Sequence, residues 1–454
     1  MKNNNWIMGK QACVSLMLHH HQPYLFVDGR RLSNVAKMWH SDDDQQRWNM
    51  ACYVGAYAEL PRMVARLSDA GLAPAIMADF SGSLLMGLDE AERDGLIDQM
   101  AGSKGGSNAA PVIGALRDTL ARFPGRLELL ATGLHHPLFH PAATPKADWG
   151  LQLDGYLALH RRLFGEGAAC TGFWPPEMAV PGSPEDTYDL IELLAARGVR
   201  YLLLPSVPYK DDWNEKALRP ASDGEGFYTK FYMPHVLRGK KDGQENWIVT
   251  LARDPRAEPQ KGMSFEGRAA EAAAGVAREF AAKGQKPPHP PLAVACSDGD
   301  NGDNMMQGRF LNSAFAGFVG SRPEQGAYGL VTATQYLEAV LTHHFGAPDW
   351  ARAREVFPEV VIQPEGFSWS GGLGNIWLNR PEKRELYDEV GRLSAAFHAR
   401  ARTKANQAAW AKACEAVMLC ETSCYTWWDG GFWLEQAQVA LGQAWEAVAS
   451  RDRQ

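Results

Sequence analysis

The chain has 454 residues, of which 45% are hydrophobic and 22% charged, and its 46 basic and 53 acidic residues give a formal net charge of −7. These proportions are ordinary for a globular protein, no segment approaches the roughly 18 apolar residues of a membrane span, and no basic run provides the electrostatic footprint of a nucleic-acid-binding protein. We therefore expect neither a membrane nor a nucleic acid as a partner, and neutral or small ligands instead.

Short apolar segments alternate with helical patterns over much of the chain. Near-continuous apolar runs of this length are typical of parallel strands buried on both faces. The segments between them have helical spacing, as at Leu60, Met63, Val64 and Leu67, or are rich in helix formers, as at 270–284. The alternation predicts β/α units. The predicted strands are 14–18, 75–79, 126–132, 170–174, 199–204, 247–252, 292–297 and 328–332.

Two stretches depart from this alternation. Residues 206–246 are polar and long for a connection, so we expect an excursion that carries part of a binding cleft. After about residue 335 the strand signals stop and helical patterns follow. We expect a catalytic α/β unit over 1–335 and a second, mainly helical region over 336–454 packed on it. The predicted helical segments of this region are 381–401, 404–420 and 433–449.

Polar and titratable residues stand where several predicted strands end. In parallel α/β folds the chemistry lies at the carboxyl ends of the strands and in the loops that follow. We therefore expect these side chains to converge at one rim of a barrel. They are His19, His20, His21 and Gln22 after 14–18, His135 and His136 after 126–132, Glu177 after 170–174, Arg253 and Asp254 after 247–252, and Asp298, Asp300, Asn301 and Asp303 after 292–297.

The segment "TGFWPPEMAV" (171–180) places one carboxylate, Glu177, directly after two prolines. Because proline fixes φ and removes a backbone donor, Pro175 and Pro176 predict a rigid turn rather than a central strand or a helix interior. The structural interpretation is an elbow whose Glu177 lies in solvent. The functional interpretation is a carboxylate held rigidly for covalent attack, which requires a near-attack position.

Several other motifs also have structural explanations. His19 and His21 share one face of a strand, and such a pair is often a satisfied hydrogen-bonding group rather than a ligand. The run "DGDNGDN" (298–304) is not followed by the bidentate Glu of a calcium loop. Cys420 and Cys424 lack the second pair that a zinc site needs. The sequence therefore predicts no metal site, and Arg253–Asp254 has the alternative of a surface ion pair.

The cysteines and the N-terminal residues indicate the cellular compartment of the chain. Seven cysteines, an odd number scattered over the chain, argue against a disulfide framework and for a reducing compartment. The opening "MKNNNWIMGKQACVSLML" has one early Lys, and Gly9, Lys10 and Gln11 interrupt its apolar residues, so it does not resemble a secretory signal. We expect a cytoplasmic chain that keeps these residues.

Taken together, the motifs resemble glycoside hydrolase family 57, the retaining enzymes that act on α-glucans. The resemblance spans most of the chain in the family's order, and it implies an incomplete (β/α)7 barrel, similar to a TIM barrel, followed by a mainly helical C-terminal region. One of the eight predicted strands then lies outside the ring. The similar segments are "HHHQPY" (19–24), "GLHHPLFHP" (133–141), "GFWPPE" (172–177), "SDGDN" (297–301), "PEGFSWSGGLGNIWLN" (364–379) and "ETSCYTWWDGGFW" (421–433).

The resemblance also implies a catalytic pair and a substrate class. Glu177 matches the family's nucleophile and Asp298 its acid/base, and retaining cleavage uses two such carboxyls. It further implies an α-glucan or maltooligosaccharide substrate, with α-1,4 and possible α-1,6 linkages, and no metal or other cofactor. We expect sugar-binding roles for His19, His21, His136, Trp174, Trp369, Trp427 and Trp428, and orienting roles for Arg253 and Asp300.

Two departures from the family bear on substrate preference. Members of the amylopullulanase type commonly carry Glu where this chain has Asp300, and an Asp where Ser423 and Cys424 stand. Hydrolysis, disproportionation and branching share one glycosyl-enzyme intermediate, so the sequence does not separate them. Two other functions stay open: a metal-dependent polysaccharide deacetylase with His19 or His21, His136 and an Asp as ligands, and a catalytically silent carbohydrate-binding protein.

The tryptophans of the last motif predict that the C-terminal region completes the active-site cleft. Trp427, Trp428 and Trp433 crowd a turn that contains Gly430 and Gly431, whereas a helix core spaces its aromatics at three or four residues. The alternative is a helix-linking turn whose rings plug the interface with the barrel.

Overall fold

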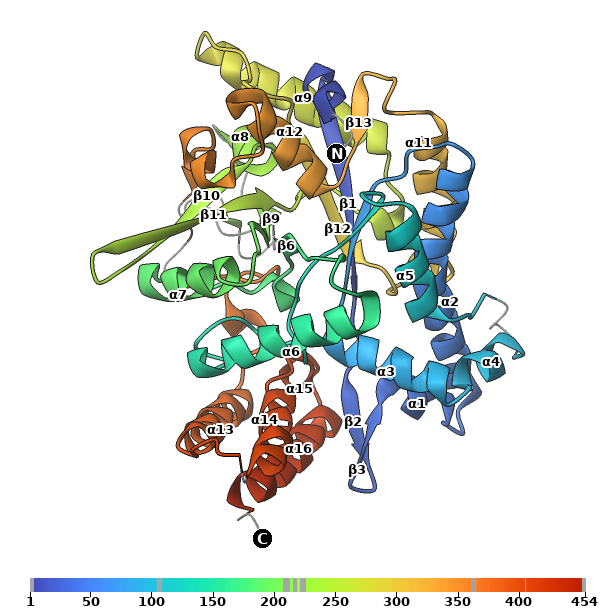
Figure 1. Ribbon diagram of the computed structural model, residues 1–454, viewed down its shortest axis with the longest axis vertical. Helices are drawn as coiled ribbons and strands as arrows, with labels where there is room; N and C mark the ends of the chain where they lie inside the picture. The colour runs from blue at the N-terminus through green and yellow to red at the C-terminus, as the bar shows by residue number, and fades with distance from the viewer. Residues whose placement is uncertain are drawn as a thin grey trace.

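Among the described residues, a ring of seven parallel strands forms the centre of the computed structural model (Figure 1). One sheet has the order β12–β1–β4–β5, and a second contains β11–β7–β6. Parallel bridges from Ala131 to Phe173 and from Arg253 to Val294 join the two sheets at both edges. The ring strands are β1 (Ala12–His20), β4 (Ile76–Phe80), β5 (Leu127–Leu129), β6 (Gly172–Phe173), β7 (Tyr201–Leu204), β11 (Gln244–Ala252) and β12 (Leu292–Asp298).

The predicted fold class, an incomplete (β/α)7 barrel followed by a mainly helical C-terminal region, is confirmed. All eight predicted strands are present, and the one outside the ring is β13 (Tyr328–Leu330), which pairs only with the first residues of β1. Residues on both faces of β1 and β4 are buried, since helices cover the outside and side chains fill the inside. This burial on both faces is why these strands form continuous apolar runs in the sequence.

Helices cover the outside of the ring, and several start at a side-chain cap. Asp43 accepts from the backbone of Gln45 at the start of α2, and Ser264 accepts from Gly267 at the start of α9. Within the described part of the chain, no helix has the length and hydrophobicity of a membrane span. These helices are α1 (Asn34–Trp39), α2 (Asp44–Asp69), α3 (Gly82–Arg93), α4 (Leu96–Ala101), α5 (Val112–Arg122), α6 (Lys146–Phe164), α7 (Pro184–Ala195), α9 (Phe265–Ala282), α10 (Asp303–Met306), α11 (Ala316–Gly320) and α12 (Ala333–Phe345).

The structure describes residues 4–103, 108–206, 213–214, 219–220, 226–360, 362, 365–404 and 406–450. The predicted excursion at 206–246 therefore falls partly outside the described residues. Its later part forms α8 (Phe227–Tyr232) and β10 (His235–Lys241), which pairs antiparallel with β11 and extends the second sheet. The remaining strands are β2 (Tyr24–Val27), β3 (Arg30–Ser33), β8 (Trp213–Asn214), β9 (Arg219–Pro220) and β14 (Glu359–Val360).

Three helices of the C-terminal region pack together at one end of the molecule, below α6 (Figure 1). They match the three predicted helical segments with ends that differ by no more than three residues. The predicted division at residue 335 falls inside α12, which packs on the 3-10 turn at residues 4–9, so the domain boundary stays a prediction. The helices of the C-terminal region are α13 (Pro381–His398), α14 (Gln407–Cys420), α15 (Cys424–Trp427) and α16 (Gly431–Ala449).

A buried carboxyl pair lies where α6 meets the C-terminal helices. Asp148 of α6 and Glu421, which follows α14, are fully buried and in hydrogen-bond contact. His398 Nε2 lies 2.6 Å from Asp148 Oδ1, and Gln152 Nε2 donates to Glu421 Oε2 at 2.6 Å. No described residue donates to the other two oxygens, so one proton shared between the carboxyls satisfies both. Burial, and then the neighbouring Asp148, raise the pKa of Glu421 well above its usual range.

The melting temperature of Glu421→Gln is expected to rise relative to that of wild type as the pH increases. The folded chain binds the Glu421 proton more tightly than the unfolded chain, so the stability that this proton provides is complete below the usual value of 4.5 and is lost as the pH rises toward the folded pKa. The Gln amide donates to Asp148 and accepts from Gln152 without titrating. Thermal unfolding of both proteins from about pH 5 to pH 8 measures the difference between their melting temperatures. Glu435→Gln, at an exposed site on α16, is the control, and a difference that does not change with pH would contradict the shared proton.

Candidate active site

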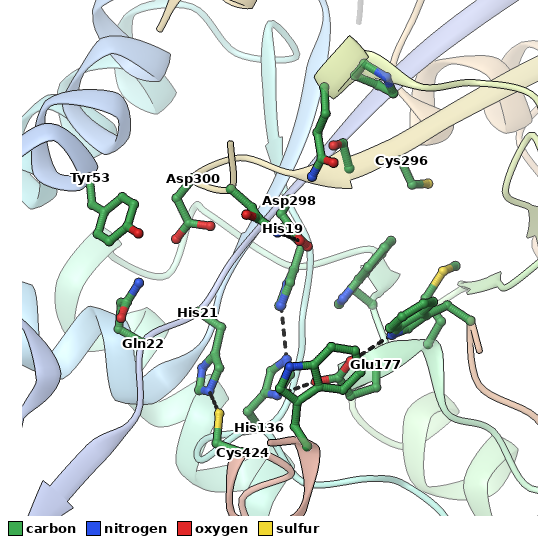
Figure 2. Close-up of a pocket in the computed structure, with 18 of the residues that line it drawn as sticks. His19, His21, Gln22, Tyr53, His136, Glu177, Cys296, Asp298, Asp300 and Cys424 are labelled. Atoms are coloured by element: carbon green, nitrogen blue, oxygen red, sulfur yellow. Dashed lines mark hydrogen bonds and ion pairs between the residues drawn. The ribbon is translucent and has the colours of Figure 1, made fainter. Parts of the chain in front are cut away.

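A cavity of about 710 Å³ lies at the carboxyl ends of the ring strands. Figure 2 shows His19 between Asp298 and His136, with Glu177 beside His136. The C-terminal region contributes to the wall through Cys424 and several tryptophans. The strand ends thus converge, and every residue to which a catalytic, sugar-binding or orienting role was assigned lines this cavity. These eleven residues are His19, His21, His136, Trp174, Glu177, Arg253, Asp298, Asp300, Trp369, Trp427 and Trp428. Four of the strand-end residues do not line it: His20, His135 and Asp254 are buried in the protein and Asp303 is exposed outside the cavity.

Glu177 is held by its backbone conformation and by two side-chain donors. It has φ 56° and ψ 16° inside a 3-10 turn (Pro176–Met178), and residues other than Gly seldom adopt this left-handed backbone conformation. Trp369 Nε1 donates to Glu177 Oε2 at 2.8 Å, and Ser423 Oγ donates to Oε1 at 3.2 Å. The predicted rigid turn is present. The side chain of Glu177 is 17% exposed, so the alternative of an elbow with Glu177 in solvent is wrong.

A strap of the C-terminal region, residues 367–369, also holds the Glu177 turn through backbone hydrogen bonds. Val180 and Phe367 exchange backbone hydrogen bonds of 2.8 and 3.0 Å, and Trp369 N donates to Glu177 O at 3.1 Å. The segment that contains Trp369 therefore positions both the backbone and the carboxylate of Glu177. Residues that the sequence separates by almost two hundred positions meet here because the strap forms an isolated antiparallel bridge with the turn.

The two carboxyls predicted for catalysis come from opposite sheets of the ring. Asp298 ends β12, where its Cα pairs with that of His19 on β1, and Asn301 Nδ2 donates to Asp298 Oδ2 at 3.2 Å. Burial raises the pKa of Glu177, the hydrogen bond from Trp369 and the charge of His19 oppose this rise, and the charge of Asp298 adds to it. The charge of Asp298 thus acts on the proton affinity of Glu177.

His19, which is partly buried, and His136, which is buried, form a pair near the two carboxyls. His19 Nδ1 lies 2.8 Å from Asp79 Oδ1, and its Nε2 lies 3.0 Å from His136 Nε2. His136 has φ 58° and is 1% exposed, and its Nδ1 lies 2.9 Å from Ser423 Oγ. All four ring nitrogens of this pair therefore have protein partners.

His21 stacks on His136 with ring centroids 3.9 Å apart and an interplanar angle of 9°. Its Nδ1 lies 2.6 Å from Ser81 Oγ and its Nε2 lies 3.1 Å from Cys424 Sγ. Burial, with the charge of His19 as a smaller contribution, lowers the pKa of His21 well below its usual value, so the ring is neutral. Burial raises the pKa of Cys424 to about 12, so this side chain is a thiol that donates to His21.

Asp300 belongs to a polar network at the edge of the cavity. Tyr57 OH donates to Asp300 Oδ2 at 2.5 Å, and Gln22 Nε2 donates to Tyr57 OH at 3.2 Å. Burial raises the pKa of Asp300 to about 7, although the hydrogen bond from Tyr57 opposes the rise. The charge of Asp298, which stands two residues earlier in the chain, contributes to the same rise.

Arg253 and Asp254 do not form the surface ion pair that was the structural alternative for them. Arg253 lines the cavity, and no described residue accepts from its buried Nε. Asp254 is fully buried and bonds to Arg268 Nε at 2.8 Å and to Tyr232 OH at 2.9 Å. Arg253 thus faces the cavity, while Asp254 belongs to the protein interior.

The tryptophans differ in their burial. Trp174 stacks on His19, with ring centroids 5.5 Å apart. Trp427 packs between Trp369 and Trp377, at centroid distances of 5.3 and 5.7 Å. Trp428 is 52% exposed at the cavity. Trp427 thus lines the cavity while its ring packs among other tryptophans of the C-terminal region, whereas Trp428 presents its ring to the solvent.

Trp427→Ala and Trp428→Ala are expected to have different effects. Trp427→Ala removes a packed ring and is expected to lower the free energy of unfolding by about 3 kcal/mol. Trp428→Ala is expected to leave the melting temperature unchanged and to raise KM for maltooligosaccharides, because an exposed aromatic ring contributes to binding by covering a sugar face. Thermal unfolding beside steady-state kinetics distinguishes them. If Trp428→Ala unfolds as early as Trp427→Ala with an unchanged KM, the ring of Trp428 is structural.

Sequence reasoning missed three residues of the site. Asp79 bonds to His19, Tyr57 bonds to Asp300, and Ser423 bonds to Glu177. Asp79 ends the predicted strand 75–79, so the rule that chemistry lies at strand ends would have found it. Tyr57 lies within α2, where no local pattern marks it. Ser423 lies in the motif at 421–433, but the sequence marked it only as a departure from the family. Among the described residues, no group of three His, Cys, Asp or Glu side chains is arranged to hold a metal ion.

Comparison with known proteins identifies the family. Residues 15–273, more than half of the chain, match the family described as Glycosyl hydrolase family 57. The GH57 branching enzyme of Thermococcus kodakaraensis has a similar structure, with 14% identity, a TM-score of 0.58, and coverage of 96% of this chain and 87% of that chain. The alpha-amylase AmyC of Thermotoga maritima has 13% identity, a TM-score of 0.56, and coverage of 96% and 92%.

The 4-alpha-glucanotransferase of Thermococcus litoralis is also similar, with 14% identity, a TM-score of 0.56, and coverage of 96% of this chain and 57% of that chain. At such identities the likeness to solved structures shows the fold alone. The search of curated proteins finds no match to the chain. The family match over 15–273 confirms the resemblance seen in the motifs, and the chain belongs to glycoside hydrolase family 57.

Proposed function

We propose that the chain is a retaining enzyme that cleaves or transfers the α-glucosidic linkages of α-glucans, with Glu177 as nucleophile and Asp298 as acid/base. The observation that carries this proposal is Glu177 itself, which lines the cavity with a largely covered side chain, is held in a left-handed turn and is bonded by Trp369 and Ser423. Membership of the family supports the reaction class. The fold shared with a branching enzyme, a glucanotransferase and an amylase supports the α-glucan as substrate.

In the first step Glu177 attacks the anomeric carbon while Asp298, in its neutral form, donates its proton to the glycosidic oxygen. The C–O bond to the leaving glucan breaks as the ester bond to Glu177 forms. The two donors to Glu177 fix its position before attack, since a covalent step needs the reacting atoms in a near-attack geometry.

In the second step Asp298, now a carboxylate, takes a proton from an incoming hydroxyl, which attacks the anomeric carbon and releases Glu177. Two inversions restore the α configuration. Water as the incoming group gives hydrolysis, and a sugar hydroxyl gives transfer to a new α-1,4 or α-1,6 linkage. The exposed ring of Trp428 at the cavity offers a face on which an acceptor sugar can stack.

Incubation with maltoheptaose and with amylose tests the proposal. We expect the α-anomer as the first product in proton NMR, no effect of EDTA, and longer maltooligosaccharides or α-1,6 branch points where transfer competes with hydrolysis. The β-anomer as first product would exclude double displacement. Chelator-sensitive release of acetate from an acetylated glycan would support the deacetylase instead, and glucan binding without any product would support the silent binding protein.

A further inference from the structure

A chain of four hydrogen-bond contacts connects Asp79 to Glu177. Asp79 Oδ1 lies 2.8 Å from His19 Nδ1, and His19 Nε2 lies 3.0 Å from His136 Nε2. His136 Nδ1 lies 2.9 Å from Ser423 Oγ, which lies 3.2 Å from Glu177 Oε1. The five residues come from β4, β1, the loop after β5, the turn before α15 and the turn after β6. The chain thus ends on the carboxylate proposed as nucleophile.

The chemistry at its two ends fixes the direction of every bond. A nucleophilic carboxylate only accepts, so Ser423 gives its single hydrogen to Glu177 and accepts from His136 Nδ1–H. His136, with its hydrogen on Nδ1, accepts at Nε2, so His19 donates from Nε2. Burial raises the pKa of Asp79, but the charge of His19 and its hydrogen bond oppose the rise, so the pair is an ionised Asp79 and a His19 that also donates from Nδ1. A histidine that donates from both nitrogens is an imidazolium, and His19 therefore carries a positive charge.

We propose that His19 is a positively charged positioning residue that acts through neutral His136 and Ser423 to keep Glu177 ionised and fixed for attack. The inference rests on the proposed role of Glu177. It assigns to His19 a role other than contact with sugar hydroxyls, because the protein already occupies both of its ring nitrogens. The same chain stabilises the carboxylate that leaves in the second step, since Ser423 then donates to the charge that develops on Glu177.

The surroundings of His19 favour this charge. Burial disfavours the imidazolium, but the carboxylates of Asp79, Asp298 and Glu177 outweigh burial and raise the pKa of His19 to about 9. Asp79 is fully buried, so its pairing with His19 is shielded from water. Burial, with the charge of His19 among the smaller contributions, lowers the pKa of His136 well below its usual value, as its acceptor role requires.

The two other histidines at the end of the same strand carry no competing positive charge. Burial lowers the pKa of His20 to about 3 and that of His21 well below its usual value, so both rings on the same strand are neutral. The groups that interact with His19 from packed elements are Asp79 on β4, His136 after β5, Glu177 after β6, Asp298 on β12 and Asp300 in the loop that follows it. The imidazolium thus lies among four carboxyls.

Kinetics of Asp79→Asn, His19→Gln and Ser423→Ala test the chain. Each variant removes the charge, or a link to the charge, that opposes protonation of Glu177. The acidic limb of the pH profile of kcat/KM is therefore expected to move up by about one pH unit. We also expect kcat to fall by about tenfold or more and KM to change by less than about twofold. Ser83→Ala is the matched control, because Ser83 bonds to His135 in a buried pair beside the chain and should leave the limb in place. A raised KM with an unmoved limb in His19→Gln would overturn the proposal in favour of a sugar contact.

A second measurement needs no activity. Nitrogen NMR of the full chain labelled at histidine is expected to show His19, assigned by its loss in His19→Gln, protonated at both ring nitrogens at pH 7 and no longer so in Asp79→Asn. Neutral His19 at pH 7 would overturn the proposal at any level of activity. Full turnover by Glu177→Gln would instead overturn the proposed function. The imidazolium signal of His19 would still support the hydrogen-bond chain in that case, so failure of the proposed function and failure of this inference give different results.

Discussion

Glu177→Gln is expected to lower kcat on maltooligosaccharides by several orders of magnitude while the fold survives. An amide does not form the glycosyl-enzyme ester, and loss of a covalent nucleophile costs more than the roughly 10²–10⁴ of a general acid or base. The Gln side chain keeps an oxygen that accepts from Trp369 or Ser423, so the turn stays in place. Steady-state kinetics beside circular dichroism measure both effects. Turnover above about a tenth of wild type would show that Glu177 is not the nucleophile.

A glycine at the same position gives a sharper test of the role. Glu177 has φ 56°, which Gly adopts without steric cost, so Glu177→Gly should keep the turn and leave a space where the carboxylate was. Azide is then expected to enter this space and to attack an activated donor such as α-maltosyl fluoride, releasing fluoride and giving the β-azide after a single inversion. Absence of a β-azide from a folded Glu177→Gly variant would contradict attack from the Glu177 face.

The ring could be predicted from the sequence because its strands are buried on both faces. Near-continuous apolar runs predict such strands directly, and all eight predicted strands were found. The closure of the ring could not be predicted in this way. It depends on two isolated bridges, Ala131 to Phe173 and Arg253 to Val294, and on a strand, β6, of only two residues. Pairings of this kind are set by packing between distant segments and have no local pattern.

The site could be predicted as far as the strand-end rule reaches. Glu177, Asp298 and the histidines line one cavity because parallel strands bring their carboxyl ends to the same rim. The same rule reaches Asp79, but it does not say which side chains bond to one another. The pairing of Asp79 with His19 spans sixty residues and that of Ser423 with Glu177 spans 246, and neither pairing has a local pattern. For this reason the sequence assigned His19 to sugar hydroxyls, whereas its contacts in the structure point to a charge that acts on the nucleophile.

Asp298→Asn is expected to lower kcat on maltooligosaccharides by about 10²–10⁴, because the amide neither protonates the glycosidic oxygen nor activates the incoming hydroxyl. The chain offers a matched control in Asp303→Asn, an exposed acid of the same loop that does not line the cavity. Circular dichroism should show both variants folded, since Asn301 still has an oxygen of Asn at position 298 to which it can donate.

The substrate dependence of Asp298→Asn separates an acid/base from a group that only shapes the cavity. Fluoride leaves without protonation, so attack by Glu177 on α-maltosyl fluoride should stay fast, and the ester to Glu177 should accumulate because no base activates water. Azide needs no base, and it should resolve the accumulated ester and give the α-azide, the product of two inversions. If the variant slowed turnover of α-maltosyl fluoride as much as turnover of maltooligosaccharides, and no glycosyl azide formed, Asp298 would not be the acid/base.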